Sequence, residues 1–204
     1  MSHFNVNWIK EYLEIEPKVV FDIGSYDGKC GLKIKNKYLN ATVISIEADF
    51  GLFSKMKNNG KLSKIEILNY AVCDIDGVVK FHHNSGHKKG SGSINKPTDR
   101  IFKFEGMSFY DPEEVPSIKM KTLCENLKIK EIDILHMDVQ SAEYEVLCGL
   151  EQIRPKMIFL EISALKFYEN SKSTNDKLIE MGYINIDIKD VTKGDELWLY
   201  KNNN

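Results

Sequence analysis

Two apolar runs near the start of the chain each end in an acidic residue, which could hold a nucleoside. Residues 19–21 lead into Asp22 and Gly24, and residues 43–46 lead into Glu47. In an open α/β sheet, the carboxyl ends of the strands form the edge where ligands bind. An acid after the next strand can accept hydrogen bonds from ribose hydroxyls. The pattern therefore predicts a cofactor that contains a nucleoside.

The glycines after the first run do not have the spacing of a dinucleotide site. That site uses G-x-G-x-x-G, whose middle glycine lets the backbone approach a pyrophosphate. Here Gly24 and Gly28 are separated by three residues, and Tyr26 occupies the middle position. The side chains of Asp22 and Asp27 would also repel a phosphate. S-adenosylmethionine, which has a sulfonium and no phosphate, fits this segment better, and we expect Gly24, Tyr26 and Gly28 to contact it.

A third acid, Asp138, follows the apolar run 132–137 and is expected at the same sheet edge. It can either cap the following helix or remove a proton from a substrate hydroxyl. His136 lies two residues earlier, on the same face of the expected strand, and is a second candidate base with a structural role as the alternative. Glu161 ends a later apolar run, where it either reaches the cleft or pairs with Lys166 or a backbone donor.

Strand-like and helix-like segments alternate along the chain. Expected strands lie at about 18–23, 42–47, 65–68, 78–81, 117–120, 132–137, 157–162, 183–188 and 196–200. Expected helices lie at about 1–16, 27–37, 123–127, 142–150 and 173–181. Asp49 is the expected cap of one more helix, and Thr122 of the helix at 123–127. This order predicts a three-layer α/β domain with a largely parallel sheet and an antiparallel final hairpin.

Residues 83–116 interrupt the alternation. A polar, glycine-rich stretch is followed by four aromatic residues between positions 102 and 110. Long loops of this kind are usually functional lids or disordered segments, and the aromatic content favours a lid over the cofactor. The aromatic rings could stack on a sugar or fold back into the core.

Composition narrows the classes of partner. The chain has 204 residues and a formal net charge of −2 at pH 7, which favours a single domain, residues 1–204, with no basic face for nucleic acid or a membrane surface. The four cysteines form no C-x-x-C pair, so we expect reduced thiols and no metal. His82, His83 and His87 fit a polar loop better than a metal site. Because residues 1–5 lack signal-peptide features and no long apolar run follows, the expected location is the cytoplasm.

Seven segments together resemble the FkbM-type family of S-adenosylmethionine-dependent methyltransferases. They are residues 20–28, 46–49, 69–74, 92–94, 134–143, 159–161 and 197–200. The resemblance implies a Rossmann-like class I methyltransferase fold, with a mostly parallel seven-stranded sheet and an antiparallel last strand. It also implies methyl transfer to a hydroxyl of a polyketide, sugar or glycan, and we expect a saccharide acceptor.

The resemblance further implies roles for individual residues. In the cofactor site, Glu47 would bind ribose with Ala48 beside it, Asp22 and Gly24 would hold the methionine end, and Asp74 or its backbone neighbours would contact adenine. The implied substrate-binding residues are Ser93 and Glu161. Two positions depart from the family pattern, because His136 stands where lysine is usual and Ser141 where glycine is usual. We expect these departures to affect the acceptor preference.

Two other functions remain open from the sequence. A nicotinamide-dependent oxidoreductase would place a ribose-binding acid much like Glu47, but Tyr26 and the lack of a recognisable Tyr-Lys pair disfavour it. A non-catalytic cofactor-binding or scaffold protein could keep the same fold.

Overall fold

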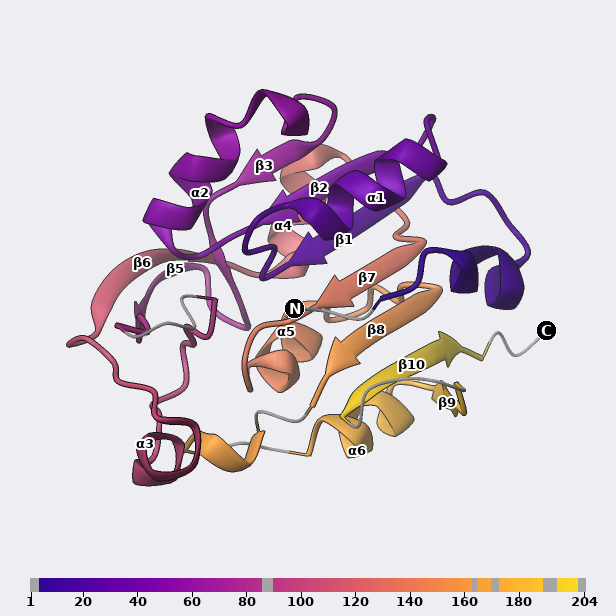
Figure 1. Ribbon diagram of the computed structural model, residues 1–204. Coiled ribbons are helices and arrows are strands. Elements are labelled where there is room, and N and C mark those ends of the chain that lie inside the picture. Colours follow the sequence, from indigo (N-terminus) through magenta and orange to yellow (C-terminus); the bar gives the residue numbers. More distant parts are fainter. Residues whose placement is uncertain (1–3, 86–89, 163–164, 170–172, 189–193, 202–204) are drawn as a thin grey trace.

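A seven-stranded sheet forms the centre of the protein, with strand order β3-β2-β1-β7-β8-β10-β9 (Figure 1). The computed structural model describes residues 4–85, 90–162, 165–169, 173–188 and 194–201. The strands are β1 (Val19–Ile23), β2 (Thr42–Ile46), β3 (Glu66–Leu68), β7 (Ile134–Met137), β8 (Met157–Glu161), β9 (Tyr183–Ile186) and β10 (Asp195–Tyr200). The first five strands in spatial order run parallel. Strand β10 is antiparallel to both β8 and β9, so the expected sheet is confirmed.

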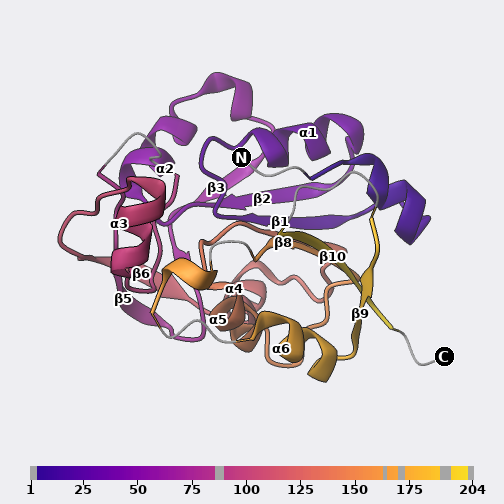
Figure 2. The ribbon, with the colours of Figure 1, turned by 60° about the horizontal axis from the view of Figure 1, so that its bottom comes forward.

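Helices cover both faces of this sheet, which gives the expected three layers (Figure 2). One face carries α1 (Lys29–Lys37) and α2 (Phe50–Lys57), and the other carries α4 (Met120–Leu127), α5 (Glu143–Gly149) and α6 (Thr174–Glu180). Side chains alternate along each strand. Val20 therefore packs in the cluster on the α1 face, and Phe21 packs in the cluster on the α4–α6 face. Asp49 caps α2 as expected, since its Oδ1 accepts the backbone N–H of Leu52 at 2.9 Å.

The N-terminal helix is shorter than expected. It is a π-helical segment, η1 (Ile9–Leu13), with residues 1–3 outside the described part. Phe4 and Trp8 precede it and pack against Phe159 of β8. Two short 3₁₀ segments are also present, η2 (Gly60–Leu62) and η3 (Leu165–Phe167).

A second, three-stranded sheet lies beside the carboxyl edge of the main one, in the order β4-β6-β5. Its strands are β4 (Ala71–Val72), β5 (Gly77–Phe81) and β6 (Glu113–Ile118). The expected strand at 117–120 is therefore misplaced. The expected Thr122 cap is also wrong, because α4 already begins at Met120. Asp76 instead accepts the backbone N–H of Lys119 and the Thr122 hydroxyl, at 2.9 and 2.8 Å.

The insertion expected as an unstructured lid has structure of its own. It contains α3 (Asp99–Glu105) and a small hydrophobic cluster, with Ile101, Met107 and Tyr168 buried and Phe109 packed against them. Tyr110 is exposed, whereas the side chains of Phe102 and Phe104 and the residues 86–89, which include His87, lie outside the described part. One aromatic ring of the segment thus joins a core and another faces solvent.

The four cysteines form no disulfide with one another; Cys73 and Cys124 are buried, and Cys30 and Cys148 are half-buried. Within the described ranges, none of the helices is long and apolar enough to cross a membrane. The cytoplasmic location and the single-domain organisation stay predictions.

Candidate cofactor and catalytic site

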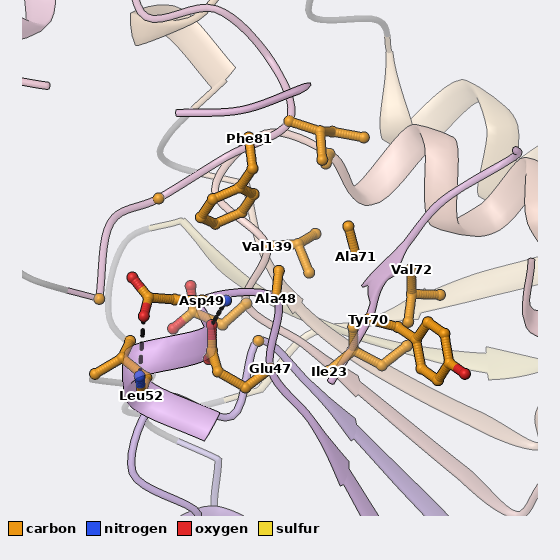
Figure 3. Close-up of a pocket in the computed structure, with 16 residues that line it drawn as sticks. Ile23, Glu47, Ala48, Asp49, Leu52, Tyr70, Ala71, Val72, Phe81 and Val139 are labelled. Atoms are coloured by element: carbon orange, nitrogen blue, oxygen red, sulfur yellow. Dashed lines mark hydrogen bonds between the residues drawn. The ribbon is translucent and has the colours of Figure 1, made fainter. Parts of the chain in front are cut away.

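A pocket opens at the carboxyl edge of β1, β2 and β7 (Figure 3). Its lining comes from the loop after β1, the turn after β2, the segment before β4, the end of β5, the insertion and the loop after β7. These lining residues are Ile23, Gly24, Glu47, Ala48, Asp49, Leu52, Tyr70, Ala71, Val72, Phe81, Gly90, Gly92, Ile94, Asp138, Val139 and Ala142. Three of them belong to the insertion, which therefore lies at the pocket, as a lid would. We call this the first pocket.

Glu47 lies at the base of the first pocket and is 6% exposed. Its two carboxylate oxygens accept the backbone N–H groups of Tyr26 and Asp49, at 2.8 and 3.0 Å. Burial raises the pKa of Glu47 to about 7, although both hydrogen bonds oppose that rise. Each oxygen keeps a lone pair for a further donor, which suits a pair of ribose hydroxyls. Ala48 lines the pocket beside it.

The glycine loop passes too close to its neighbours for larger residues. A Cβ on Gly24, whose φ is +73°, would lie 2.0 Å from the carbonyl oxygen of Asp138. Gly24 lines the first pocket, as expected of a cofactor-binding residue. Gly28 does not, because it faces Leu62 behind the loop, where a Cβ would lie 2.8 Å from Leu62 Cδ1. Gly28 therefore has a packing role in the structure and not the cofactor contact that the sequence predicted.

A second pocket adjoins the first and shares Gly24, Gly90 and Asp138 with it. Its other lining residues are Phe4, Asp22, Ser25, Tyr26, Asp27, Lys29, Cys30, Lys33, Ser91, His136 and Gln140. Tyr26 therefore lies between the two spaces, with its ring close to Gly90. Because the pockets share Asp138, a cofactor in one and an acceptor in the other would both lie near that carboxylate.

Asp22 does not present a free carboxylate to the cofactor. It is fully buried, and its Oδ2 accepts hydrogen bonds from Ser25 Oγ, Gly31 N and Ser45 Oγ at 2.5 to 3.1 Å. Its Oδ1 lies 2.6 Å from His136 Nδ1. Burial opposes charge on both side chains, but their pairing lowers the pKa of Asp22 and, with Cys30, holds the pKa of His136 well above its usual value. Through Ser25 and Gly31, Asp22 holds the glycine loop in place, and its expected contact with the methionine end stays a prediction.

Asp138 lines both pockets and does not cap α5, whose N-cap is Ala142. Its Oδ1 accepts the side-chain amide of Gln140 at 2.7 Å. Burial raises the pKa of Asp138, and Glu161 at the end of β8 adds to the rise. Glu161 is thus near enough to act on Asp138, but it lines neither pocket.

Two expected site residues lie away from the pockets. Asp74 is exposed and lines neither, because β4 ends at Val72 and the chain turns outward. Its backbone neighbours Tyr70, Ala71 and Val72 line the first pocket instead. Ser93 is buried, and its hydroxyl accepts the backbone N–H of Asn95 at 3.0 Å. Of the two options predicted for adenine, the backbone neighbours of Asp74 lie at the pocket and the Asp74 side chain does not. Ser93 lines neither pocket, which argues against its predicted contact with substrate.

Sequence reasoning did not assign a role to Glu143 or Asn95. Glu143 is fully buried, and burial raises its pKa to about 8, with Asp138 and Glu161 contributing. Its Oε1 accepts the backbone N–H of Val139 at 3.3 Å. The Asn95 amide donates to the carbonyl and hydroxyl oxygens of Ser141, at 2.8 and 3.2 Å. The position of Glu143 inside the most specific matching segment was the available signal; Asn95 had none.

The whole arrangement suits S-adenosylmethionine. The first pocket combines one buried acid for a ribose with an apolar surface at Leu52, Tyr70 and Phe81 for an adenine ring. No lysine or arginine lines the first pocket among the described residues, as a pyrophosphate site would need. The model of the methyltransferase FkbM domain matches residues 2–185. The chain belongs to the FkbM methyltransferase family. Its cofactor is S-adenosylmethionine, which overturns the nicotinamide-dependent alternative.

A curated relative agrees with this assignment. The 2-O-methyltransferase NoeI of Sinorhizobium fredii (strain NBRC 101917 / NGR234) is 27% identical over 169 residues, which are 79% of this chain and 70% of that protein. Family membership confirms the resemblance drawn from the seven segments, and it makes the protein an S-adenosylmethionine-dependent methyltransferase.

Solved structures share the fold. A TehB-like S-adenosylmethionine-dependent methyltransferase from Corynebacterium glutamicum ATCC 13032 superposes with a TM-score of 0.53 at 9% identity, covering 98% of this chain and 89% of that one. A putative caffeoyl-CoA O-methyltransferase from Staphylococcus aureus also gives 0.53, at 11% identity and coverages of 98% and 85%. At such low identity these similarities establish only the class I methyltransferase fold.

Proposed function

We propose that the protein is an O-methyltransferase that acts on a hydroxyl of a sugar or glycan. The supporting observation is the position of Asp138, which lines both the first pocket and the adjoining second pocket. A base at that point can reach an acceptor hydroxyl on one side while the cofactor lies on the other. The name of the relative NoeI, a 2-O-methyltransferase, supports oxygen as the methyl acceptor.

The residues divide the work of methyl transfer. The cofactor supplies a methyl group on a sulfonium, which leaves as a neutral thioether. Glu47 holds the ribose, and Gly24 lets the cofactor approach the backbone near Asp138. Placing the acceptor oxygen in line with the methyl group supplies most of the acceleration. Asp138 then accepts the hydroxyl proton, and its raised pKa makes it a stronger base than an exposed aspartate.

His136 is a weaker candidate for the base. Its pKa lies well above the usual histidine value because Cys30 and Asp22 flank it, so the ring carries its proton near neutral pH. A protonated imidazole cannot accept a proton. His136 instead supplies the buried cation that pairs with Asp22, at the position where lysine is usual in the family.

Transfer of a labelled methyl group to a panel of mono- and oligosaccharides tests the proposal. We expect the parent protein to label at least one saccharide. Asp138→Asn should lower turnover by about 10²- to 10⁴-fold, the range for a positioned base, while cofactor binding changes little. Asp176→Asn, at an exposed position on α6, is the matched control.

Full turnover in Asp138→Asn would remove the base assignment. Cofactor binding without labelling of any saccharide, polyketide or other hydroxyl compound would favour the non-catalytic alternative. Labelling of an amine or a carboxylate in place of a hydroxyl would contradict the proposed sugar acceptor.

A further inference from the structure

A buried polar cluster lies behind the glycine loop, on the α1 face of the main sheet. It consists of Asp22, Cys30 and His136, whose polar atoms all lie within 4.8 Å of one another. The surrounding layer is apolar, and the rings of Phe4 and Phe159 have centroids 5.7 Å from that of His136. Asp22 and His136 are buried, whereas Cys30 is only half-buried and lines the second pocket. The thiol is thus the part of the cluster that a small molecule can reach.

The three side chains are ordered as carboxylate, imidazole and thiol. Asp22 Oδ1 holds His136 Nδ1 at 2.6 Å, which fixes the plane of the ring. The Cys30 sulfur lies within 4.8 Å of the nearest ring nitrogen of the cluster, that of His136. Asp22 is itself held by Ser25, Gly31 and Ser45 and cannot turn away. The imidazolium is therefore held in a fixed position beside the thiol.

Positive charge lies on more than one side of the Cys30 sulfur. Lys29 and Lys33 line the same pocket as Cys30, and His136 belongs to the same buried cluster. These cations can stabilise the negative charge that develops on the sulfur as it attacks a disulfide.

We propose that Cys30 is a modification site for small disulfides in the second pocket. The Cys30 sulfur attacks one sulfur of the disulfide, a new S–S bond forms, and the old S–S bond breaks. The Cys30 proton is released to water and the leaving thiolate takes a proton from water, so a thiol is released. The imidazolium of His136 stabilises the negative charge that develops on the sulfur during the exchange. The second pocket, about 370 Å³ in volume, would then contain the added group next to Asp138. Loss of methyl transfer on modification rests on the proposed function, whereas the reactivity of Cys30 does not.

The other cysteines provide internal controls. Cys73 and Cys124 are buried, and burial raises the pKa of both thiols, that of Cys124 to about 11. Cys148, in α5, is half-buried like Cys30 but is not in the cluster. It is therefore the matched thiol for comparison.

The experiment treats the full chain with hydroxyethyl disulfide at pH 7 and follows each cysteine by peptide mass spectrometry. We expect Cys30 to form the mixed disulfide at least about tenfold faster than Cys148, because Cys30 lies in the cluster with the imidazolium of His136. The Cys30→Ser variant should lose the fast phase and Cys148→Ser should keep it. His136→Gln should slow Cys30 by about tenfold. Equal rates for Cys30 and Cys148, or an unchanged rate in folded His136→Gln, would overturn the proposal.

A second measurement needs no variant and covers the case in which His136→Gln does not fold. In urea the rates of Cys30 and Cys148 should become equal, since the cluster exists only in the folded chain. A difference that persists in urea would overturn the proposal. One zinc ion retained per chain after dialysis, with protection of Cys30, would also overturn it by identifying a metal site.

The consequence for the pocket is measured separately. Reducing the mixed disulfide should restore saccharide methylation in the parent protein. The methylation rate of the Cys30→Ser variant, whatever its value before treatment, should not change on treatment. Fast modification of Cys30 with no methyl transfer by the untreated enzyme would contradict the proposed function and leave the thiol chemistry intact.

Discussion

Asp22 and Glu47 end neighbouring strands and are both nearly inaccessible to solvent, but their surroundings differ. Burial raises the pKa of each. For Asp22 the adjacent His136 and two hydroxyl donors outweigh burial, and the net pKa falls. Glu47 has only two backbone N–H partners, so burial prevails and its pKa rises to about 7. Asp22 therefore uses its carboxylate oxygens within the fold, whereas the carboxylate of Glu47 can still accept hydrogen bonds from a ligand.

The largest expected effect on stability comes from removing the charge of Asp22. Asp22→Asn leaves His136 buried without its anion, and losing one partner of a buried ion pair costs about 3–5 kcal/mol of unfolding free energy. Urea denaturation near pH 5.5 measures the loss. Asp27→Asn, on the same loop but partly exposed, is the control and should lose less than about 0.5 kcal/mol. A loss below about 1 kcal/mol in Asp22→Asn would contradict the buried pair.

The pH dependence of this loss sharpens the comparison. The raised pKa of His136 stabilises the fold below the usual histidine value of 6.5, and this contribution disappears as pH rises through the folded-state pKa. The lowered pKa of Asp22 stabilises the fold above the usual value of 3.8, and this contribution disappears as pH falls through the folded-state pKa. The difference between the parent and Asp22→Asn should therefore be greatest between pH 3.8 and 6.5.

Removing the charge of the ligand-binding acid should act on affinity. Glu47→Gln replaces one ribose acceptor by an amide, and we expect a loss of about 1.5–3 kcal/mol in binding S-adenosylmethionine, the range for hydrogen bonds to a charged group. Isothermal titration calorimetry measures it. Glu66→Gln, in β3 and exposed, is the matched control. Unchanged affinity in Glu47→Gln would remove the ribose assignment.

Titration of Glu47 should make cofactor affinity depend on pH. The ionised carboxylate accepts both ribose hydroxyls, so the dissociation constant should fall as pH rises through about 7 and then level off. Below that value each pH unit should weaken binding by up to about tenfold, or 1.36 kcal/mol. Affinity measured from pH 5.5 to 8.5 checks this, and the slope should vanish in Glu47→Gln. A parent curve that is flat across pH 7 would show that the charge of Glu47 does not matter.

The smallest expected effect concerns the turn that positions Asp138. Ser141 has a φ of +85°, in the left-handed region that favours glycine. Ser141→Gly should relieve this strain and raise the unfolding free energy by about 1 kcal/mol, while Asn95 keeps its bond to the backbone carbonyl. Thermal unfolding measures the change. A clear loss of stability would show that the Ser141 hydroxyl matters more than the backbone strain.

Local pattern was sufficient for the main sheet and for much of the pocket. The apolar strands, the Asp49 cap and the glycine turn after Gly24 each depend on residues close together in sequence. They correctly predicted Gly24, Glu47 and Asp138 at one edge. In the small second sheet, β5 was predicted as a strand at 78–81, and the strand predicted at 117–120 overlaps only the end of β6. That these strands form a separate sheet was not predicted, because β6 pairs with β4 and β5 across more than 30 residues and its own pattern is short. Helix α3 was not predicted either.

Side-chain direction and long-range pairing determined the rest. An acidic residue after an apolar run can be placed at the sheet edge from the sequence. The partner of its carboxylate depends on the register between strands that are far apart in the sequence. Asp22 meets His136, 114 residues away, because β1 and β7 are adjacent in the sheet. Asp74 follows the end of β4 and is exposed, and Ser93 is buried with its hydroxyl bonded to Asn95, so neither residue lines a pocket. The sequence therefore established the fold and the presence of acids at its edge, whereas three-dimensional packing determined which of those acids remain able to bind a ligand.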